Sequence, residues 1–306
     1  MRHDAAMDLA ALMSTMKAMS RLTLPKVFVS EIRKASSVTL LTCCGLRHFA
    51  GPAGSSLTSG RTAGRLVIVG DVHGCSAELE DLLEAADFHK RSDELIFVGD
   101  LIGKGPSPRE VVRIAREFSA KAVQGNHEYN LLRWRRRGAP LPDPEKKIKE
   151  SYAATVKDLE EDDWQWLEAL PLMLHLDLPK SPLPVVVVHA GLVPGVPMDQ
   201  QKPYDLVHLR SIDAEGHGSK LFDAGAGAWA KNWQGPTQVI FGHDARRGLQ
   251  KEAFAIGLDT GAVYGDKLTA LLLPKNWDKP LTSLDNSHFL SVKSHRAYAS
   301  KSDSKA

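Results

Sequence analysis

The 306-residue sequence predicts an α/β domain built around parallel strands. First, short apolar runs alternate with helical patterns from about residue 65 onward, an arrangement typical of β-α-β units. Second, five short blocks place a metal-ligand side chain beside a glycine, and most of them directly follow an apolar run. These blocks are Gly70-Asp71-Val72-His73-Gly74, Gly99-Asp100, Gly125-Asn126-His127-Glu128, His189-Ala190-Gly191 and Gly242-His243.

In the first part of this domain, strand patterns and helix patterns take turns. Residues 66–69 are an apolar run bounded by glycine, which predicts a buried strand. Leucines recur on one face of residues 76–86, which predicts a helix. Ser107 can cap a further helix that has Pro108 in its first turn. We also expect strands at residues 94–98 and 121–124 and a helix at residues 129–137.

The second part of the domain is richer in strand patterns. A helical insertion is expected first, at about residues 144–169, where Trp164 and Leu167 share a face and should contact the core. Short apolar or β-branched runs follow it and predict strands. These lie at residues 172–176, 185–188, 239–241, 253–258, 263–264 and 268–272.

Composition bounds the class of protein. The chain is 43% hydrophobic and 25% charged, which is typical of a soluble globular protein. Its net charge of +2 is low for a protein that binds nucleic acid through bulk charge. No apolar stretch approaches the roughly 18 to 20 residues that span a bilayer. The three cysteines, Cys43, Cys44 and Cys75, do not form a pattern expected of a disulfide framework, which favours a reducing compartment.

Both ends of the chain differ from the domain between them, which we place at residues 64–275. Residues 1–63 carry eight Lys or Arg against three acidic residues and are rich in Ser, as transit peptides are. They predict a mitochondrial address; the alternative is a disordered extension of a cytoplasmic protein. Residues 286–306 are polar and are expected to form a disordered tail.

The five blocks predict a site for two metal ions. Side chains on loops after parallel strands converge at one edge of the sheet, and neighbouring glycines allow close approach. Asp71 and His73 alternate across one residue and can face the same ion. Asp100 has two carboxylate oxygens and can bridge both ions. The proposed ligands are Asp71, His73 and Asp100 for one ion and Asp100, Asn126, His189 and His243 for the other.

This ligand set indicates phosphate chemistry. Nitrogen and oxygen donors without thiolate suit Mn²⁺, Fe or Zn²⁺ better than Ca²⁺, with Mg²⁺ a further candidate. Two such ions about 3.5–4 Å apart polarise a phosphoryl oxygen and lower the pKa of a bound water towards about 7. The expected reaction is attack on phosphorus by a metal-bound hydroxide, with Asp100 as the catalytic carboxylate that bridges the two ions. His127 can give the leaving oxygen its proton.

Basic residues near the blocks are candidates for binding the substrate phosphate. Lys104 stands between two glycines, four residues after Asp100. Arg210 and Arg246 are weaker candidates because an isolated arginine is usually a surface residue. Asn126 is expected to contact the phosphate as well as a metal.

Taken one at a time, each block has an ordinary structural explanation. Asp71 could close a turn, and His189 could be a buried histidine with satisfied hydrogen bonds. The occurrence of all five blocks in this order favours a functional site. Cys75 and the histidines outside the blocks are expected to be packing or surface residues.

At these blocks the sequence resembles metal-dependent phosphatases of the calcineurin-like phosphoesterase fold. The resemblance runs from about Arg65 to Pro274. The segment Gly99-Asp100-Leu101-Ile102-Gly103-Lys104-Gly105-Pro106 is similar to that of the eukaryotic ApaH-like phosphatases, whereas Ser/Thr phosphoprotein phosphatases carry Asp-Arg-Gly at residues 103–105. Residues 241–245 and 257–261 also resemble the ApaH-like group.

The resemblance implies a four-layer α-β-β-α sandwich, with the metals at its edge and His127 as general acid. It also implies substrates among phosphoproteins, dinucleoside polyphosphates, polyphosphate and capped RNA ends. One residue departs from the Ser/Thr enzymes: Gly103 stands where they carry an acidic residue that orients the catalytic histidine. Asp244 is a candidate substitute.

The sequence thus predicts a dinuclear metallophosphatase that hydrolyses phosphate esters or anhydrides. The alternative enzyme is a pyrophosphohydrolase acting on dinucleoside polyphosphates, polyphosphate or capped RNA 5′ ends, to which the basic tail could guide RNA. A more distant alternative is a metal-binding scaffold without turnover. Such a protein would normally have lost ligands or the acid, and all are present here.

Overall fold

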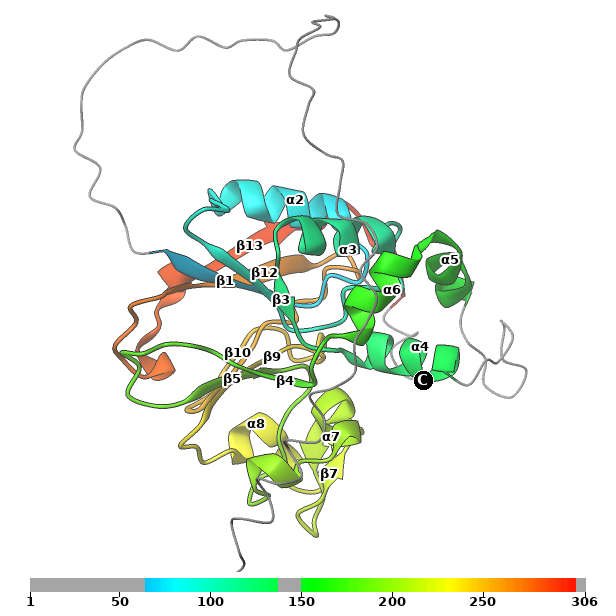
Figure 1. The fold of residues 1–306 in the computed structure, drawn as a ribbon. Helices are drawn as coiled ribbons and strands as arrows, with labels where there is room; N and C mark the ends of the chain where they lie inside the picture. The colour runs from blue at the N-terminus through cyan, green and yellow to red at the C-terminus, as the bar shows by residue number, and fades with distance from the viewer. Residues whose placement is uncertain (1–63, 137–149, 301–306) are drawn as a thin grey trace, which may run out of the picture. The chain divides into compact units, whose positions relative to one another are not determined.

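The computed structural model describes residues 64–136 and 150–300, which contain two five-stranded sheets and a small three-stranded one (Figure 1). The helices are α2 (Ser76–Ala85), α3 (Pro108–Glu117), α4 (Asn126–Arg136), α5 (Glu150–Asp158), α6 (Glu161–Glu168), α7 (Pro203–His208) and α8 (Trp229–Asn232). Short 3₁₀ helices lie at Met198–Gln200, Leu281–Ser283 and Asn286–His288.

The first sheet has the order β13-β12-β1-β2-β3, and its middle strands match the predicted positions. Its strands β1, β2 and β3 are parallel, whereas β12 and β13 join antiparallel. The parallel arrangement that the sequence predicts therefore holds for part of the sheet. The bounds are β13 (Phe289–Lys293), β12 (Lys267–Pro274), β1 (Arg65–Val69), β2 (Glu94–Phe97) and β3 (Lys121–Ala122).

The second sheet has the order β10-β11-β9-β5-β4, with β11, β9 and β5 parallel and an antiparallel strand at each edge. Its strands are β10 (Gln250–Lys251), β11 (Ala255–Gly257), β9 (Gln238–Phe241), β5 (Val185–Val188) and β4 (Met173–His175). The small sheet joins β6 (Ser211–Ile212) to β7 (Gly218–Ser219) and β8 (Gly227–Ala228). Residues 263–264, expected as a strand, form only an isolated bridge at Tyr264.

Alternation of side chains along the strands explains why the two large sheets stack. Successive residues of a strand point to opposite faces. In β1, Leu66 and Ile68 are buried in the same cluster as Val185 and Val187 of β5, whereas Val67 belongs to a different cluster with α2 and α3. One face of each sheet therefore packs against the other sheet.

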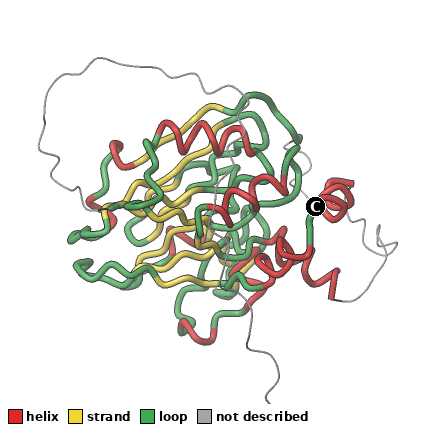
Figure 2. The backbone as a smooth tube through the Cα atoms, turned by 45° about the horizontal axis from the view of Figure 1, so that its top comes forward, coloured by secondary structure: helices red, strands yellow, loops and turns green. Residues whose placement is uncertain are grey.

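The opposite face of each sheet is covered by helices (Figure 2). On the second sheet, Val239 and Phe241 of β9 pack with Trp229 of α8 and Leu206 of α7. The rings of Trp229 and Phe241 meet edge to face, with centroids 4.8 Å apart. The helix-sheet-sheet-helix layering implied by the resemblance is confirmed.

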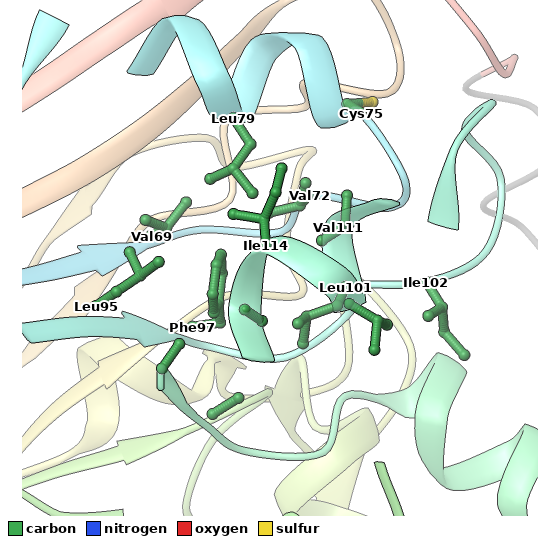
Figure 3. Close-up of a cluster of buried hydrophobic side chains, with 14 of the residues drawn as sticks. Val69, Val72, Cys75, Leu79, Leu95, Phe97, Leu101, Ile102, Val111 and Ile114 are labelled. Carbon is green, nitrogen blue, oxygen red and sulfur yellow. The ribbon is translucent and has the colours of Figure 1, made fainter. Parts of the chain in front are cut away.

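On the first sheet, α2 and α3 cover the face that carries Val69 and Phe97 (Figure 3). Leu79 of α2 and Ile114 of α3 point into this cluster (Figure 3). Cys75 is fully buried in the same cluster, which agrees with a packing role.

The helical insertion is present as α5 and α6, and its earlier residues, 137–149, lie outside the described part of the chain. Trp164 and Leu167 of α6 are buried in the cluster beneath α3, as expected from their shared face. Buried Asp163, also on α6, pairs with Arg116 of α3, so an ion pair reinforces this contact.

The prediction of a disordered tail over residues 286–306 is wrong for residues 286–300. Phe289–Lys293 form β13, which pairs with β12 at the edge of the first sheet. Leu290 and Val292 alternate with Ser291 and Lys293, a two-residue period that the polar average composition of the segment concealed. Farther along, the backbone N–H of His295 donates to buried Glu78 at 2.9 Å, which ties the segment to α2.

Residues 1–63 lie outside the described residues, as do residues 301–306, so the proposed leader and its address stay predictions. Within the described ranges, no helix combines the length and the apolar character needed to cross a bilayer.

The sandwich core predicts where stability is most sensitive. Leu271 of β12 is fully buried between the sheets, opposite Ile68 of β1. We expect Leu271→Ala to lower the free energy of unfolding by about 3 kcal/mol, because it removes buried methyl groups and leaves a cavity. Urea unfolding followed by circular dichroism measures this loss. Leu249→Ala, at a leucine that is 38% exposed, is the control and should cost under about 1 kcal/mol; equal losses would contradict the proposed layering.

Candidate metal centre

All five sequence blocks lie at the carboxyl ends of the parallel strands and meet at one edge of the sandwich. Asp71 and His73 follow β1, and Asp100 follows β2; Asn126 begins α4 after β3. The second sheet contributes two histidines, one after β5 and one after β9. These side chains line or border one cavity of about 580 Å³; those in its wall are Asp71, His73, Asp100, Asn126, His127 and His243.

Asp100 lies at the middle of this group. Its Oδ2 atom is 3.5 Å from Nε2 of His73 and 3.5 Å from Nε2 of His189. Its Oδ1 atom accepts the backbone N–H of His127 at 2.9 Å. One oxygen is thus held by the protein, while the other faces an imidazole from each sheet. This is the geometry that a bridging carboxylate requires.

The hydrogen bonds of these two histidines leave the inner nitrogens free of protons. Nδ1 of His189 is 2.9 Å from the carbonyl oxygen of Val98, and Nδ1 of His73 is 3.3 Å from that of Ile102. Because a carbonyl accepts only, each Nδ1 carries the proton and each Nε2 presents a lone pair. Burial lowers the pKa of His189 to about 3 and that of His73 well below its usual value. Both rings are therefore neutral, as metal ligands must be.

His243 completes the group from the second sheet. Its backbone N–H donates to both carboxylate oxygens of Asp71 at 3.1 Å, and its Nε2 is buried without a hydrogen-bond partner among the described residues. Nε2 of His189 lies 3.1 Å from Oδ1 of Asn126, so two lone-pair donors face each other. A cation between these atoms would satisfy them, so the donors fit a divalent metal ion.

Two clusters of the described residues could each hold an ion, and they share Asp100. Asp100, His189 and His243 have ligand atoms within 4.8 Å of one another, as do His73, Asp100 and His127. The second cluster differs from the predicted ligand set by holding His127 in place of Asp71. Asp71 is nevertheless close, with Oδ2 4.0 Å from Nε2 of His73.

Asp259, after β11, is a buried member of this region that the sequence analysis did not assign. It lines the same cavity and is 5% exposed, close enough to raise the pKa of Asp71 through charge repulsion. Burial is the main cause of the raised pKa of Asp71 and of the values of about 6 for Asp100 and Asp259. Three buried carboxylates favour a bound cation. The same pattern of apolar run, aspartate and nearby glycine at residues 255–261 could have identified Asp259.

Glu128, the last residue of the third block, holds the loops in position. Its buried carboxylate accepts backbone N–H groups from Asp100 and Gly125 at 2.8 Å and from Ile102 at 3.0 Å. Burial, with repulsion from Asp100, raises the pKa of Glu128 to about 8. The residue joins the loop after β2 to the start of α4, and it had no assigned role because those segments are far apart in the sequence.

The loop backbones are strained at the donors themselves. His73, Asp100 and His243 have φ angles of 49°, 50° and 68°, and Lys104 has 41°. Residues other than glycine rarely adopt these φ values, and each residue held there costs about 1–3 kcal/mol. Two other non-glycine residues, Asp87 and Ser119, share this conformation within the described ranges. The concentration of strained residues at this edge is typical of a functional site.

The predicted phosphate-binding cations all line the cavity. Nζ of Lys104 is 3.1 Å from Nε2 of His73 and donates to the hydroxyl of Tyr264 at 2.9 Å. Arg210 is partly buried, and Arg246 is exposed with its guanidinium 5.1 Å from the ring centroid of Phe222. Tyr264 and Phe222 were not expected here, because their position depends on long-range folding.

Gly103 lies against His127. A Cβ atom at Gly103 would lie 2.2 Å from Nδ1 of His127, so the ring occupies the space that an acidic side chain would need. Asp244, the candidate substitute, forms an ion pair with Arg247. This pairing uses Oδ2 of Asp244, whereas its Oδ1 atom is buried without a hydrogen-bond partner among the described residues.

Comparisons with known proteins agree with this architecture. A profile described as calcineurin-like phosphoesterase matches residues 64–268, which contain every candidate donor. The asymmetrical bis(5′-nucleosyl)-tetraphosphatase PrpE of Oceanobacillus iheyensis is 27% identical over 69% of this chain and 89% of its own length. The symmetrical bis(5′-nucleosyl)-tetraphosphatase of Coxiella burnetii is 29% identical over 67% of this chain and 87% of its own length.

A solved structure supports the fold directly. The crystal structure of a protein assigned as a diadenosine tetraphosphatase is 36% identical to this chain, with a TM-score of 0.63. The match covers 76% of this chain and 95% of that protein. The shared fold therefore extends over nearly the whole of that protein.

Metal binding tests the centre without reference to any reaction. We expect the wild-type protein to bind two equivalents of Mn²⁺ and Asp100→Asn to bind at least about tenfold more weakly, because the amide lacks the charge and one acceptor. Calorimetric titration and metal analysis after gel filtration measure this. Asp93→Asn is the control, since the Asp93 side chain is also buried but pairs with Arg65. Unchanged binding by Asp100→Asn would refute the shared ligand.

Proposed function

This chain belongs to the calcineurin-like phosphoesterase family, and from that premise we propose that it hydrolyses the phosphoanhydride bonds of dinucleoside polyphosphates with two divalent metal ions, Mn²⁺ first among the candidates. Membership makes the protein a hydrolase of phosphoric esters or anhydrides that needs divalent metal ions. The observation that carries the proposal is Oδ2 of Asp100, placed 3.5 Å from an Nε2 atom of each sheet.

The choice of substrate is supported by the relatives and by two residues of this chain. The curated relatives above are named for the hydrolysis of bis(5′-nucleosyl) tetraphosphates. Gly103 and Lys104 separate this chain from the Ser/Thr enzymes, and the ring of His127 fills the space of the acidic residue that those enzymes carry. Dinucleoside polyphosphates are therefore favoured over phosphoproteins.

We assign the candidate ligands to the two ions by the clusters they form. His73 and Asp100, with Asp71 nearby, would hold one ion; Asp100, His189 and His243, with Asn126, would hold the other. When bound, such ions polarise a phosphoryl oxygen and acidify a water. Glu128 and the proton-bearing Nδ1 atoms keep the donors oriented for this task.

The remaining polar side chains would handle the substrate's charge and the proton. Lys104 and Arg210 line the cavity and would bind phosphate oxygens as cations. His127 would donate a ring proton to the leaving phosphate oxygen. Its backbone N–H is fixed by Asp100 at 2.9 Å, so the ring stands beside the ligands at a set position.

A substrate panel tests the proposal. Purified protein with Mn²⁺ is given diadenosine tetraphosphate, tripolyphosphate, a phosphopeptide and capped RNA at equal concentration, and the products are separated chromatographically. We expect the dinucleotide to have the highest kcat/KM, and EDTA to abolish turnover. A preference for another member of the panel would overturn the substrate assignment. Metal binding without turnover of any member would favour a non-catalytic scaffold.

The role of His127 has a separate test, because the geometry also places it beside His73 and Asp100. If His127 is the general acid, His127→Asn lowers kcat about 10²–10⁴-fold while Mn²⁺ binding is retained. If it is instead a ligand, the variant loses an equivalent of metal. His295→Asn is the matched control, since His295 lies on the exposed surface and pairs with Asp81. Steady-state kinetics and metal analysis on the same samples distinguish the two roles.

The packing of Gly103 against His127 yields another prediction. Gly103→Ala should lower kcat about tenfold or more, because the new Cβ displaces the catalytic ring. Gly195→Ala is the control: Gly195 has a similar φ of +78° against +88° at Gly103, but a Cβ added there meets no atom within 4 Å. Thermal unfolding should show a loss of stability in both variants from the positive φ, larger in Gly103→Ala because of the contact with His127, and kinetics should show a large loss of kcat only in Gly103→Ala. Equal activities would mean that His127 tolerates displacement.

A further inference from the structure

One wall of the metal-centre cavity is unusually apolar for an exposed surface. Among the large hydrophobic side chains that the structure describes, Tyr204, Leu221 and Leu249 are the exposed ones, at 45%, 61% and 38%. Tyr204 and Leu221 line the cavity, and Phe222 lines it beside them. They come from α7 and from the loop after β7, two segments that lie side by side (Figure 1).

Tyr204 offers a flat, supported surface. Its ring stacks on that of His208 with centroids 4.2 Å apart and planes 15° apart. Both residues belong to α7, where positions four apart share a face. The stack holds the tyrosine ring in one orientation and covers one of its faces, while the side chain stays 45% exposed. A planar ligand can stack on such a ring without ordering it further.

The loop that carries Leu221 and Phe222 is also held in place. The hydroxyl of Ser211 donates to the carbonyl oxygen of Leu221 at 2.6 Å. Arg247 donates to the carbonyl oxygen of Phe222 and lies over its ring, 4.0 Å from the centroid. These contacts fix the backbone, so the exposure of Leu221 belongs to a structured loop.

Positive charge accompanies this wall. Arg210, Lys220 and Arg246 line the same cavity as Tyr204 and Leu221. The cavity therefore joins three features: a cluster of metal-ligand donors, several cations and an exposed aromatic and aliphatic surface. Its volume of about 580 Å³ lies within the roughly 300–1,000 Å³ of small-molecule sites. A nucleoside polyphosphate has the matching parts, a reacting phosphate, an anionic chain and a flat apolar base.

We propose that Tyr204, Leu221 and Phe222 form a subsite that binds the nucleobase of a nucleoside polyphosphate whose reacting phosphate lies at the metal centre. The inference rests on the proposed function, because it needs a nucleotide in the cavity. It adds the residues that distinguish a nucleotide from a phosphate chain lacking a base. Arg210, Lys220 and Arg246 then bind the phosphates between base and metals.

The test compares a substrate that carries nucleobases with one that has none. Kinetics are measured for wild type, Tyr204→Ala, Leu221→Ser and Tyr204→Phe on diadenosine tetraphosphate and on tripolyphosphate. We expect Tyr204→Ala and Leu221→Ser to lower kcat/KM for the dinucleotide about tenfold, mainly through KM, and to leave tripolyphosphate within about twofold. Tyr204→Phe keeps the ring and should keep the wild-type value. Leu249→Ala is the control, an exposed leucine outside the cavity.

Other results would overturn the subsite. Equal losses on both substrates would show that these side chains act on the phosphate chain or on the fold, and unchanged kinetics would show that the wall does not contact the base. If wild type preferred an apolar phosphopeptide to tripolyphosphate, and the variants lost that preference, the wall would instead bind peptide.

A binding measurement separates this proposal from the proposed function. Calorimetry with ADP and with pyrophosphate, in the presence of Mn²⁺, needs no turnover. The subsite predicts that Tyr204→Ala weakens ADP binding about tenfold and leaves pyrophosphate binding unchanged. If wild type hydrolyses neither substrate, the proposed function fails, whereas the ADP result still decides the subsite. If wild type bound ADP and pyrophosphate with equal affinity, and Tyr204→Ala left both affinities unchanged, the subsite would be refuted.

Discussion

The site depends on one buried carboxylate, that of Asp100. Its Oδ2 faces histidines from both sheets, its Oδ1 accepts a backbone N–H, and its own backbone N–H is held by Glu128. Burial of such a group is unfavourable unless cations or hydrogen bonds compensate it. The strained φ of 50° at Asp100 persists because these contacts over-determine the loop. The position of Asp100 thus ties the metal-centre geometry to the fold as a whole.

The sandwich brings together donors of different chemistry. The first sheet supplies mainly oxygen donors, Asp71, Asp100 and Asn126, whereas the second supplies His189 and His243. Neither sheet alone could surround two ions with this mixture. Because the sheets meet through the alternating apolar residues of β1 and β5, core packing sets the distances between donors. Metal binding and closure of the sandwich should therefore stabilise each other.

The candidate donors could be placed near one another from the sequence because each lies within a few residues of a strand end, and the structure brings them to one edge of the sandwich. Asp259 follows the same rule and was recoverable. Glu128 and Tyr204 were not, because their roles depend on contacts between segments distant in the sequence. The edge strand β13 was missed because the polar composition of its segment obscured the alternation of Leu290 and Val292. Asp244 was considered as a partner of His127, but Arg247, three residues on, pairs with it.

The charge within the cavity favours divalent cations at the candidate ligands. Asp71, Asp100 and Asp259 are buried together, and burial raises the pKa of each, while the charge of nearby Lys104 acts in the opposite direction. When these carboxylates are ionised, their charge would repel an approaching polyphosphate. Bound divalent cations would offset this charge, while Arg210 and Arg246 at the wall would attract anions. Under the proposed function, bound metal ions would therefore favour the approach of an anionic substrate to His127, beside the apolar wall that would hold its base.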